Sequence, residues 1–240
     1  MRGGTDDGTN AARANCMPPG GKKPFDVTVV LELIRAEVGR FADAAMFALR
    51  DAGFGDTFQQ LVGCMISIRT RDEVSLPAAL RLLKRAPDAE TMSRMEAAEI
   101  DELIHPATFH LAKAHQIRDM AVRITEEMGG DLPCDFDTLT SFKGIGPKCA
   151  NLALGIACGE KAVSVDVHVQ RVTNRWGYVR TKTAEETREE LEGKLPKQFW
   201  IEINRLLVPF GKHVCTGSLP KCSVCPVLEY CRQVGVEAHR

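Results

Sequence analysis

The sequence predicts an all-α fold, and three observations lead to this prediction. From Val27 onward, hydrophobic residues recur at helical rather than strand spacing in nearly every segment. Residues that typically begin and end helices flank those segments, and no segment reads convincingly as a strand. With 44% hydrophobic residues, the 240-residue chain can bury a core in one large domain or in two small ones.

The first elements in chain order are a leader and a buried helix. Residues 1–24 are rich in Gly, Asn, Asp, Ala and Pro, and this composition predicts a disordered leader. A helix is then predicted by an apolar stripe at positions i, i+3, i+4, i+7 and i+8, formed by Phe58, Leu61, Val62, Met65 and Ile66.

Two further helices are marked by their ends. One runs from about His110 to Met128, is ended by Gly129-Gly130, and has an apolar face made of Ile117, Met120, Ala121 and Ile124. In the other, a capping box of Thr183 and Glu186 opens an acidic helix that closes near Pro196.

The segment around residue 145 has the pattern of a hairpin between two helices. Gly144 and Gly146 allow a tight turn that exposes backbone N–H groups, while Ile145 plugs the gap between the helices. Pro147 suits the first helical position, where its missing N–H costs nothing. The turn therefore meets a helix N-terminus, which favours a phosphate and can bind a duplex without reading its sequence. Taken alone, the pattern is also typical of an ordinary loop between core helices.

Lys148 and Asp166 are the candidate catalytic residues. Lys148 lies in the first turn after the hairpin, where it can contact a phosphate or, as an unprotonated amine, form a Schiff base with a sugar carbon. Asp166 begins the next helix, where it serves as an N-cap or stabilises positive charge on a sugar whose base departs. His168 either meets the sugar-phosphate backbone or is an ordinary surface histidine.

Four cysteines near the C-terminus give the strongest chemical signal. Their spacing is C-x6-C-x2-C-x5-C, formed by Cys215, Cys222, Cys225 and Cys231. Four thiolates so close together repel or oxidise unless a cation holds them, and zinc and a 4Fe-4S cluster both accept four thiolates. Structural zinc usually draws on two short pairs, so the single close pair here modestly favours iron-sulfur. The other five cysteines are scattered and are interpreted as structural or incidental: Cys16, Cys64, Cys134, Cys149 and Cys158.

Charge and hydropathy limit the classes of protein. The formal net charge of -1 and the pI near 6.6 are not typical of a nucleic-acid binder. The acidic surplus is local, however, because residues 110–182 sum to +2 and residues 194–240 to +4, so the second half can present a basic face. No apolar run suits a membrane span or an N-terminal signal peptide, which predicts an intracellular protein without membrane contact. In a reducing compartment, clustered thiols more often hold metal than form disulfides.

Together, the hairpin ending in Lys148, the Val-Asp-x-His run at Asp166 and the four-cysteine loop resemble the endonuclease III family, which are DNA glycosylases with a helix-hairpin-helix motif. The likeness runs in the same order over nearly the whole of residues 25–232. The resemblance implies an all-α protein of two helical domains with a DNA cleft between them.

The same resemblance implies where the domains lie. A helical barrel that contains the helix-hairpin-helix would cover residues 50–160. An iron-sulfur cluster domain would combine residues 25–49 with 161–240.

The resemblance also implies a bifunctional DNA glycosylase and AP lyase of base excision repair, acting on oxidised pyrimidines in damaged double-stranded DNA. Lys148 would attack C1′ of the flipped nucleotide, Asp166 would assist, and β-elimination from the Schiff base would nick the strand. The four cysteines would hold a mainly structural 4Fe-4S cluster. We further expect a monomer, located with the nucleoid in a bacterial cytoplasm or in the nucleus of a eukaryote.

The expected DNA contacts are His168, the hairpin and two wedge residues, and the chain departs from the family pattern at three positions. Arg69 replaces a glutamine that fills the gap left by the flipped nucleotide; its guanidinium can fill that gap or stack on bases. Phe109 stands in the second wedge loop, as an apolar wedge or as a core residue. Lys143 replaces a proline and makes the loop of Gly144, Ile145 and Gly146 more basic.

Two other classes share part of the pattern. Monofunctional adenine or mismatch glycosylases have the hairpin, the aspartate and the four cysteines but usually lack the lysine. Those specific for adenine carry a further C-terminal domain, whereas this sequence continues for nine residues after Cys231. A non-catalytic iron-sulfur DNA-binding protein would use Lys148 for a phosphate contact alone, and the pairing of Lys148 with Asp166 argues against it.

Overall fold

The computed structural model describes residues 21–240, and all regular secondary structure in this range is helical. The all-α prediction is therefore confirmed. The α-helices are α1 (Val27–Val38), α2 (Ala45–Asp51), α3 (Thr57–Ser67), α4 (Asp72–Arg85), α5 (Ala89–Ser93), α6 (Ala97–Ile104), α7 (His110–Met128), α8 (Phe136–Thr140), α9 (Pro147–Ala153), α10 (Val167–Trp176), α11 (Ala184–Lys194) and α12 (Glu202–His213). A π-helical segment η1 (Leu154–Cys158) continues α9, and short 3-10 turns are η2 (Lys197–Phe199) and η3 (Cys222–Val224).

The three helices predicted from sequence are present, and the two whose limits were predicted have the expected limits. The stripe from Phe58 to Ile66 is buried on α3. Helix α7 ends at Gly129, whose φ of 68° lies in the left-handed region that favours glycine. The side chain of Thr183 accepts a hydrogen bond from the Glu186 N–H and forms the predicted capping box of α11.

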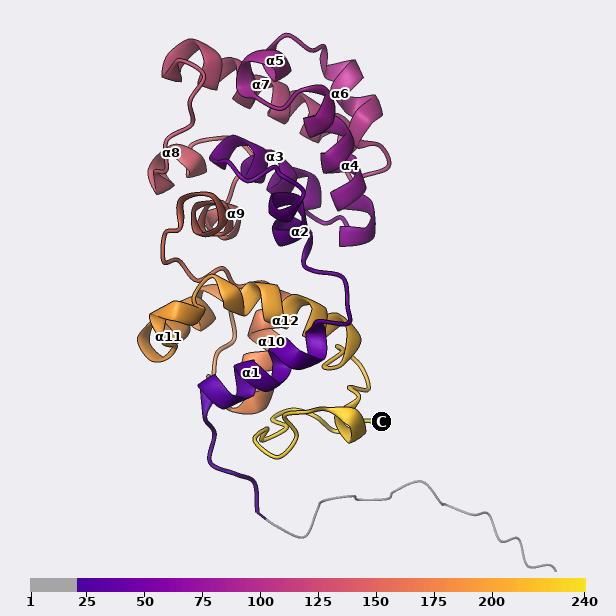
Figure 1. Ribbon diagram of the computed structural model, residues 1–240, viewed down its shortest axis with the longest axis vertical. Coiled ribbons are helices and arrows are strands. Elements are labelled where there is room, and N and C mark those ends of the chain that lie inside the picture. The colour runs from indigo at the N-terminus through magenta and orange to yellow at the C-terminus, as the bar shows by residue number, and fades with distance from the viewer. Residues whose placement is uncertain (1–20) are drawn as a thin grey trace, which may run out of the picture.

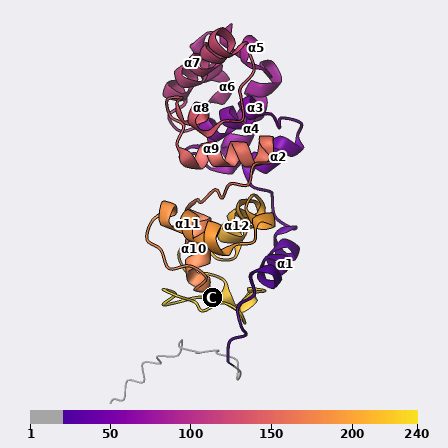
Figure 2. The same ribbon diagram turned by 90° about the vertical axis from the view of Figure 1, so that its left-hand side faces the viewer.

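The helices pack around two separate hydrophobic cores, seen as an upper and a lower lobe in Figure 1. The upper core draws its residues from Ala44 to Ile156, with Val208 of α12 added, and the lower core draws them from α1 and from the chain after residue 162. In Figure 2 helix α9 lies at the base of the upper lobe, facing α10 and α12 below it. The upper lobe is thus one continuous stretch of chain inserted into the lower lobe.

Ion pairs reach from α12 of the lower lobe to the upper lobe. The Lys212 ammonium lies 2.7 Å from an Asp72 oxygen of α4, and Arg205 lies 3.0 Å from an Asp51 oxygen of α2. These contacts link α12 to two helices of the upper lobe.

Most of the predicted leader, residues 1–20, lies outside the described residues, as does Cys16. Lys22 and Lys23, in the described end of the predicted leader, contact the C-terminal loop. The Lys23 N–H donates to the Glu229 carbonyl at 2.8 Å, and the Lys22 ammonium donates to the Leu228 carbonyl at 2.9 Å. Within residues 21–240, no helix is long and apolar enough to cross a bilayer.

The cysteines outside the C-terminal loop form two pairs that the sequence did not reveal. Cys134 and Cys158 form a disulfide. The sulfur atoms of Cys64 on α3 and Cys149 on α9 lie 2.8 Å apart as free thiols. Both pairs tie the α9–η1 segment, which begins at the hairpin, to the rest of the upper lobe.

Candidate active site and cysteine cavity

The hairpin between α8 and α9 has the predicted turn. Gly144 has a φ of 91°, in the left-handed region, so the backbone of the turn favours glycine. A Cβ there would lie 2.8 Å from the Gln116 side-chain oxygen, which is the movable end of that side chain. Ile145 is 7% exposed and fills the gap between the helices. Its N–H donates to the Phe142 carbonyl at 3.1 Å. Ile145 therefore shapes the turn from inside, and neither its side chain nor its N–H faces solvent.

The remaining hairpin residues are exposed. Lys143, Gly144 and Gly146 lie on the surface, and Pro147 occupies the first position of α9, as expected. Lys148 follows in the first helical turn with an exposed side chain. A ligand that approaches the start of α9 therefore meets this lysine first.

Asp166 is the N-cap of α10. One of its oxygens, Oδ1, accepts hydrogen bonds from the N–H groups of His168 and Val169, both at 2.9 Å. Just before it, the Ser164 hydroxyl donates to the Lys148 carbonyl at 3.3 Å. This hydrogen bond joins the segment that carries Asp166 to the first turn of α9. The two segments that carry the candidate catalytic residues are therefore linked directly to each other.

Lys148 and Asp166 line one cleft of about 730 Å³. The upper lobe supplies part of its wall with Ser67, Arg69, Thr70, Arg71, Asp72, Glu73 and Lys148. The lower lobe supplies the rest with Asp166, Val167, His168, Val208, Lys212 and His213. The structure thus brings together four of the residues singled out from sequence. Phe109 and residues 143–146 lie outside this lining.

His168 is half-buried in the cleft wall, and its ring is held from two sides. Arg171 Nη2 lies 3.0 Å from His168 Nδ1 and also donates to the Gly211 carbonyl at 2.9 Å. Because burial and the neighbouring Arg171 and Lys212 cations outweigh the nearby carboxylates, the pKa of His168 lies below its usual value. Neutral His168 with Nδ1 as the acceptor is the form that this arrangement favours.

Arg69 and Phe109 contact each other at the rim of the cleft. The Arg69 guanidinium lies over the Phe109 ring, 5.4 Å from its centroid. Phe109 is 57% exposed, so it is not a residue of the hydrophobic core.

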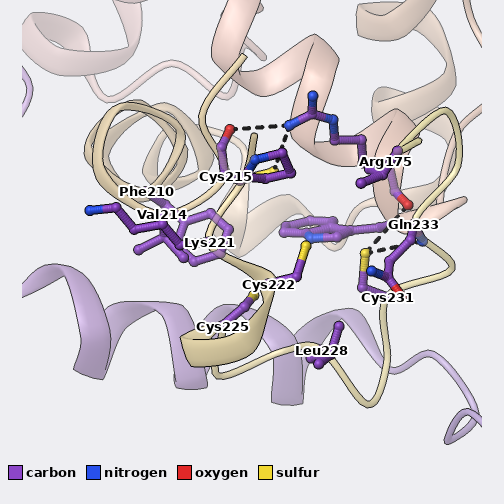
Figure 3. A pocket seen from close by; sticks show the side chains of 13 residues that line it. Arg175, Phe210, Val214, Cys215, Lys221, Cys222, Cys225, Leu228, Cys231 and Gln233 are labelled. Carbon is purple, nitrogen blue, oxygen red and sulfur yellow. Dashed lines mark hydrogen bonds between the residues drawn. The ribbon is translucent and has the colours of Figure 1, made fainter. Parts of the chain in front are cut away.

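The four C-terminal cysteines line a single apolar cavity with Phe210, as Figure 3 shows, and Trp176 also lines it. Arg175 donates to the Cys215 sulfur, and the Gln233 N–H donates to the Cys231 sulfur, both at 3.4 Å. When these cysteines are free thiols, their burial raises the pKa of Cys225 to about 12 and the pKa of Cys231 to about 11.

These residues fit a cluster better than a single ion. Each cysteine of a 4Fe-4S cluster binds its own iron, so the four sulfurs surround a cavity instead of meeting at one point. N–H groups directed at sulfur also suit a cluster, whose sulfurs accept such bonds.

Comparisons with known proteins agree with the fold. The chain matches the model of the HhH-GPD superfamily of base excision DNA repair proteins over residues 62–197. Endonuclease III of Thermotoga maritima is 32% identical over 203 residues, covering 85% of this chain and 92% of that protein. The chain belongs to the endonuclease III family.

Two further comparisons extend this result. Endonuclease III-like protein 1 of Gallus gallus is 37% identical over 177 residues, covering 72% of this chain and 63% of that protein, so the match spans just under two thirds of the relative's length. A solved non-covalent endonuclease III–DNA complex superimposes with a TM-score of 0.74 at 24% identity, covering 86% of this chain and 94% of that one. This likeness shows a shared fold.

Two residues beside the site were not singled out from the sequence. Gly211 lies against the His168 ring, where a Cβ would come within 2.6 Å of Nδ1. Lys113 is buried beneath Arg69 and Phe109. The sequence did contain an indication that Lys113 is buried. Lys113 stands four residues before Ile117, so a charged residue occupies a position on the apolar face of α7.

Proposed function

We propose that this protein is a bifunctional DNA glycosylase and AP lyase that removes oxidised pyrimidines from duplex DNA in base excision repair and nicks the strand by β-elimination. The observation that carries the proposal is that Lys148 and Asp166 line one cleft from adjoining helix starts. A nucleophilic amine and a carboxylate facing the same space can act on opposite sides of one sugar.

The proposed chemistry uses these two residues in sequence. Lys148 Nζ bonds to C1′ while the C1′–N glycosidic bond breaks and the base leaves with the electron pair. The Asp166 carboxylate stabilises the positive charge that develops on the sugar. Its Oδ1 is occupied by α10, whereas Oδ2 accepts no hydrogen bond from residues 21–240 and is available to the sugar.

The second half of the reaction breaks the strand. Opening of the sugar ring leaves a Schiff base between Lys148 and C1′, loss of a C2′ proton follows, and the C3′–O bond breaks. Hydrolysis of the Schiff base then frees Lys148. The flipped nucleotide must reach the cleft first, at a cost that damage reduces by weakening base pairing.

The proposed partner is damaged double-stranded DNA, bound by a monomer. Lys143 and the exposed turn of Gly144 and Gly146 would hold backbone phosphates, with Ile145 supporting the turn from inside. His168 would meet the sugar-phosphate backbone, and Arg69 and Phe109 would enter the base stack.

We also propose that Cys215, Cys222, Cys225 and Cys231 hold a 4Fe-4S cluster, for which the shared cavity is the support. When bound, the cluster would supply structural cross-linking of the C-terminal loop. The two hydrophobic cores support the division into a barrel domain and a cluster domain. Metal analysis that finds zinc without iron or sulfide would reject the cluster proposal.

The test of the enzymatic proposal is borohydride trapping. The protein is incubated with duplex DNA that contains an abasic site or thymine glycol, and borohydride is added to reduce any Schiff base to a stable adduct. We expect an adduct and strand cleavage with the wild-type protein and neither with Lys148→Ala.

Lys84→Ala is the matched control, because Lys84 is an exposed lysine on α4 outside the cleft. It should give the wild-type amount of adduct. Cleavage that persists in Lys148→Ala would reject the lysine mechanism. Base release without any adduct would instead indicate a monofunctional glycosylase.

A further inference from the structure

A buried lysine lies directly under the cleft rim. Lys113 of α7 is 5% exposed, and its ammonium donates to the carbonyls of Ile66 and Ile68, both at 2.7 Å, and to the Thr70 hydroxyl at 3.1 Å. An ammonium has three N–H donors, and all three are used. A buried charge is costly unless it is paired or fully hydrogen-bonded, and here the two carbonyls and the hydroxyl offset that cost.

The hydroxyl of Thr70 joins two loops. It accepts from Lys113 Nζ and from the Thr108 N–H, both at 3.1 Å, and it donates to the Ile68 carbonyl at 3.3 Å. Its one donor and two acceptor positions are therefore all occupied. Thr70 belongs to the loop that carries Arg69, and Thr108 belongs to the loop that carries Phe109. Lys113 thus holds one loop directly and the other through Thr70.

Both carried residues have unusual backbones. Arg69 has a φ of 55° and Phe109 a φ of 58°, in the left-handed region that side chains with a Cβ rarely adopt. Such conformations persist where surrounding bonds determine them, and they concentrate at functional sites. Here the two strained residues are the two that contact each other as an exposed cation–aromatic pair.

We propose that Lys113 is a positioning residue that holds Arg69 and Phe109 as one preassembled wedge for opening the duplex. The inference rests on the proposed function and deepens it. Both planar groups can stack on bases once a nucleotide leaves the helix. Without Lys113, the two loops relax separately, and duplex DNA must order them as it binds. Attack by Lys148 on a sugar that is already unstacked does not need this wedge.

The test separates duplex opening from chemistry. Lys113→Met removes the ammonium and keeps an unbranched apolar side chain, and Thr70→Val removes the hydroxyl with little change in shape. Borohydride trapping is timed on an abasic site in a duplex and on the same site in a single strand. A fluorescent base analogue next to the site reports unstacking independently of the chemistry.

We expect each variant to slow trapping on the duplex by roughly tenfold. This is the change expected if the backbone of about one residue must become ordered when DNA binds. Single-strand trapping should stay within about twofold of wild type, and the analogue signal should fall in the duplex. The double variant should be little worse than either single variant, since both changes break the same connection. Lys84→Met, at an exposed site, should match wild type on both substrates.

Equal losses on duplex and single strand would overturn the proposal, because they would mean that Lys113 supports the fold of the site in general. Unchanged duplex trapping in both variants would overturn it as well. If Lys113→Met does not fold, Thr70→Val decides the same comparison. Failure of the wild-type protein to trap either substrate would instead reject the proposed lyase function.

Discussion

The contact between His168 and Gly211 gives a sharp prediction for a single added methyl group. In Gly211→Ala, the new Cβ would lie 2.6 Å from His168 Nδ1, 2.9 Å from its Cβ and 3.0 Å from its Cγ. Rotation of the His168 side chain about its Cα–Cβ bond can relieve the first and third contacts. It cannot relieve the second, because the His168 Cβ is fixed to α10. Helix α10 must therefore shift against α12.

The expected loss of folding stability in Gly211→Ala combines two unfavourable effects and one favourable effect. Overpacking of this kind costs about 1–3 kcal/mol, and loss of the Arg171–His168 hydrogen bond costs about 1 kcal/mol. Alanine in place of a helical glycine returns up to about 1 kcal/mol. The net loss is about 2 kcal/mol, which corresponds to a fall in melting temperature of roughly 4–8 °C for a chain of this size.

The assay is a double-mutant cycle measured by chemical denaturation. In a His168→Ala background, two of the three short contacts disappear, so Gly211→Ala should cost at least about 1 kcal/mol less than in the wild-type protein. The same cost in both backgrounds would refute the reasoning. Stabilisation by Gly211→Ala in the wild-type protein would refute it equally.

Three other expectations follow from particular contacts. Gly144→Ala should lower the free energy of unfolding by about 1–2 kcal/mol. It should also weaken duplex binding in a fluorescence anisotropy titration, and an unchanged affinity would show that the turn accepts a side chain. Because the pKa of His168 is lowered in the folded protein, the unfolded chain binds more protons than the folded one. The melting temperature should therefore fall as pH drops below about 6.5, and it should fall less in His168→Asn. The same slope of melting temperature against pH in both proteins would contradict this. Reduction of Cys134–Cys158, which are separated by 24 residues, should cost about 3–4 kcal/mol by the loop-entropy relation, whereas the melting temperature of Cys134→Ser should not respond to the reductant.

Helix limits and the hairpin could be predicted from sequence because their causes are local. The limits of α7 follow from an apolar stripe and a glycine that ends it, and α11 begins at a capping box between residues three apart. The burial of Ile145 follows from its place between two glycines. The role of Asp166 as an N-cap is confirmed for the same reason.

The rest depended on contacts between segments far apart in the chain. Nothing near Cys134 indicates its bond to Cys158, and the pair Cys64 and Cys149 is 85 residues apart. Gly211 was one glycine among 20, and its importance depends on α10 packing against α12. Lys113 was visible as a charge in an apolar stripe, but the carbonyls that accept from it are more than 40 residues away.

The insertion of one lobe into the other has a consequence for synthesis of the chain. Helix α1 leaves the ribosome early, yet the apolar residues of its partner α12 begin only at residue 203. At roughly 5–20 residues per second, this delay is on the order of 10–30 s. During that time the inserted lobe can close its own core, while Val30, Leu31 and Ile34 of α1 have no surface to cover them. Helix α1 is therefore made early but is among the last helices to be buried, and it is a segment of the nascent chain that a chaperone would have good reason to hold.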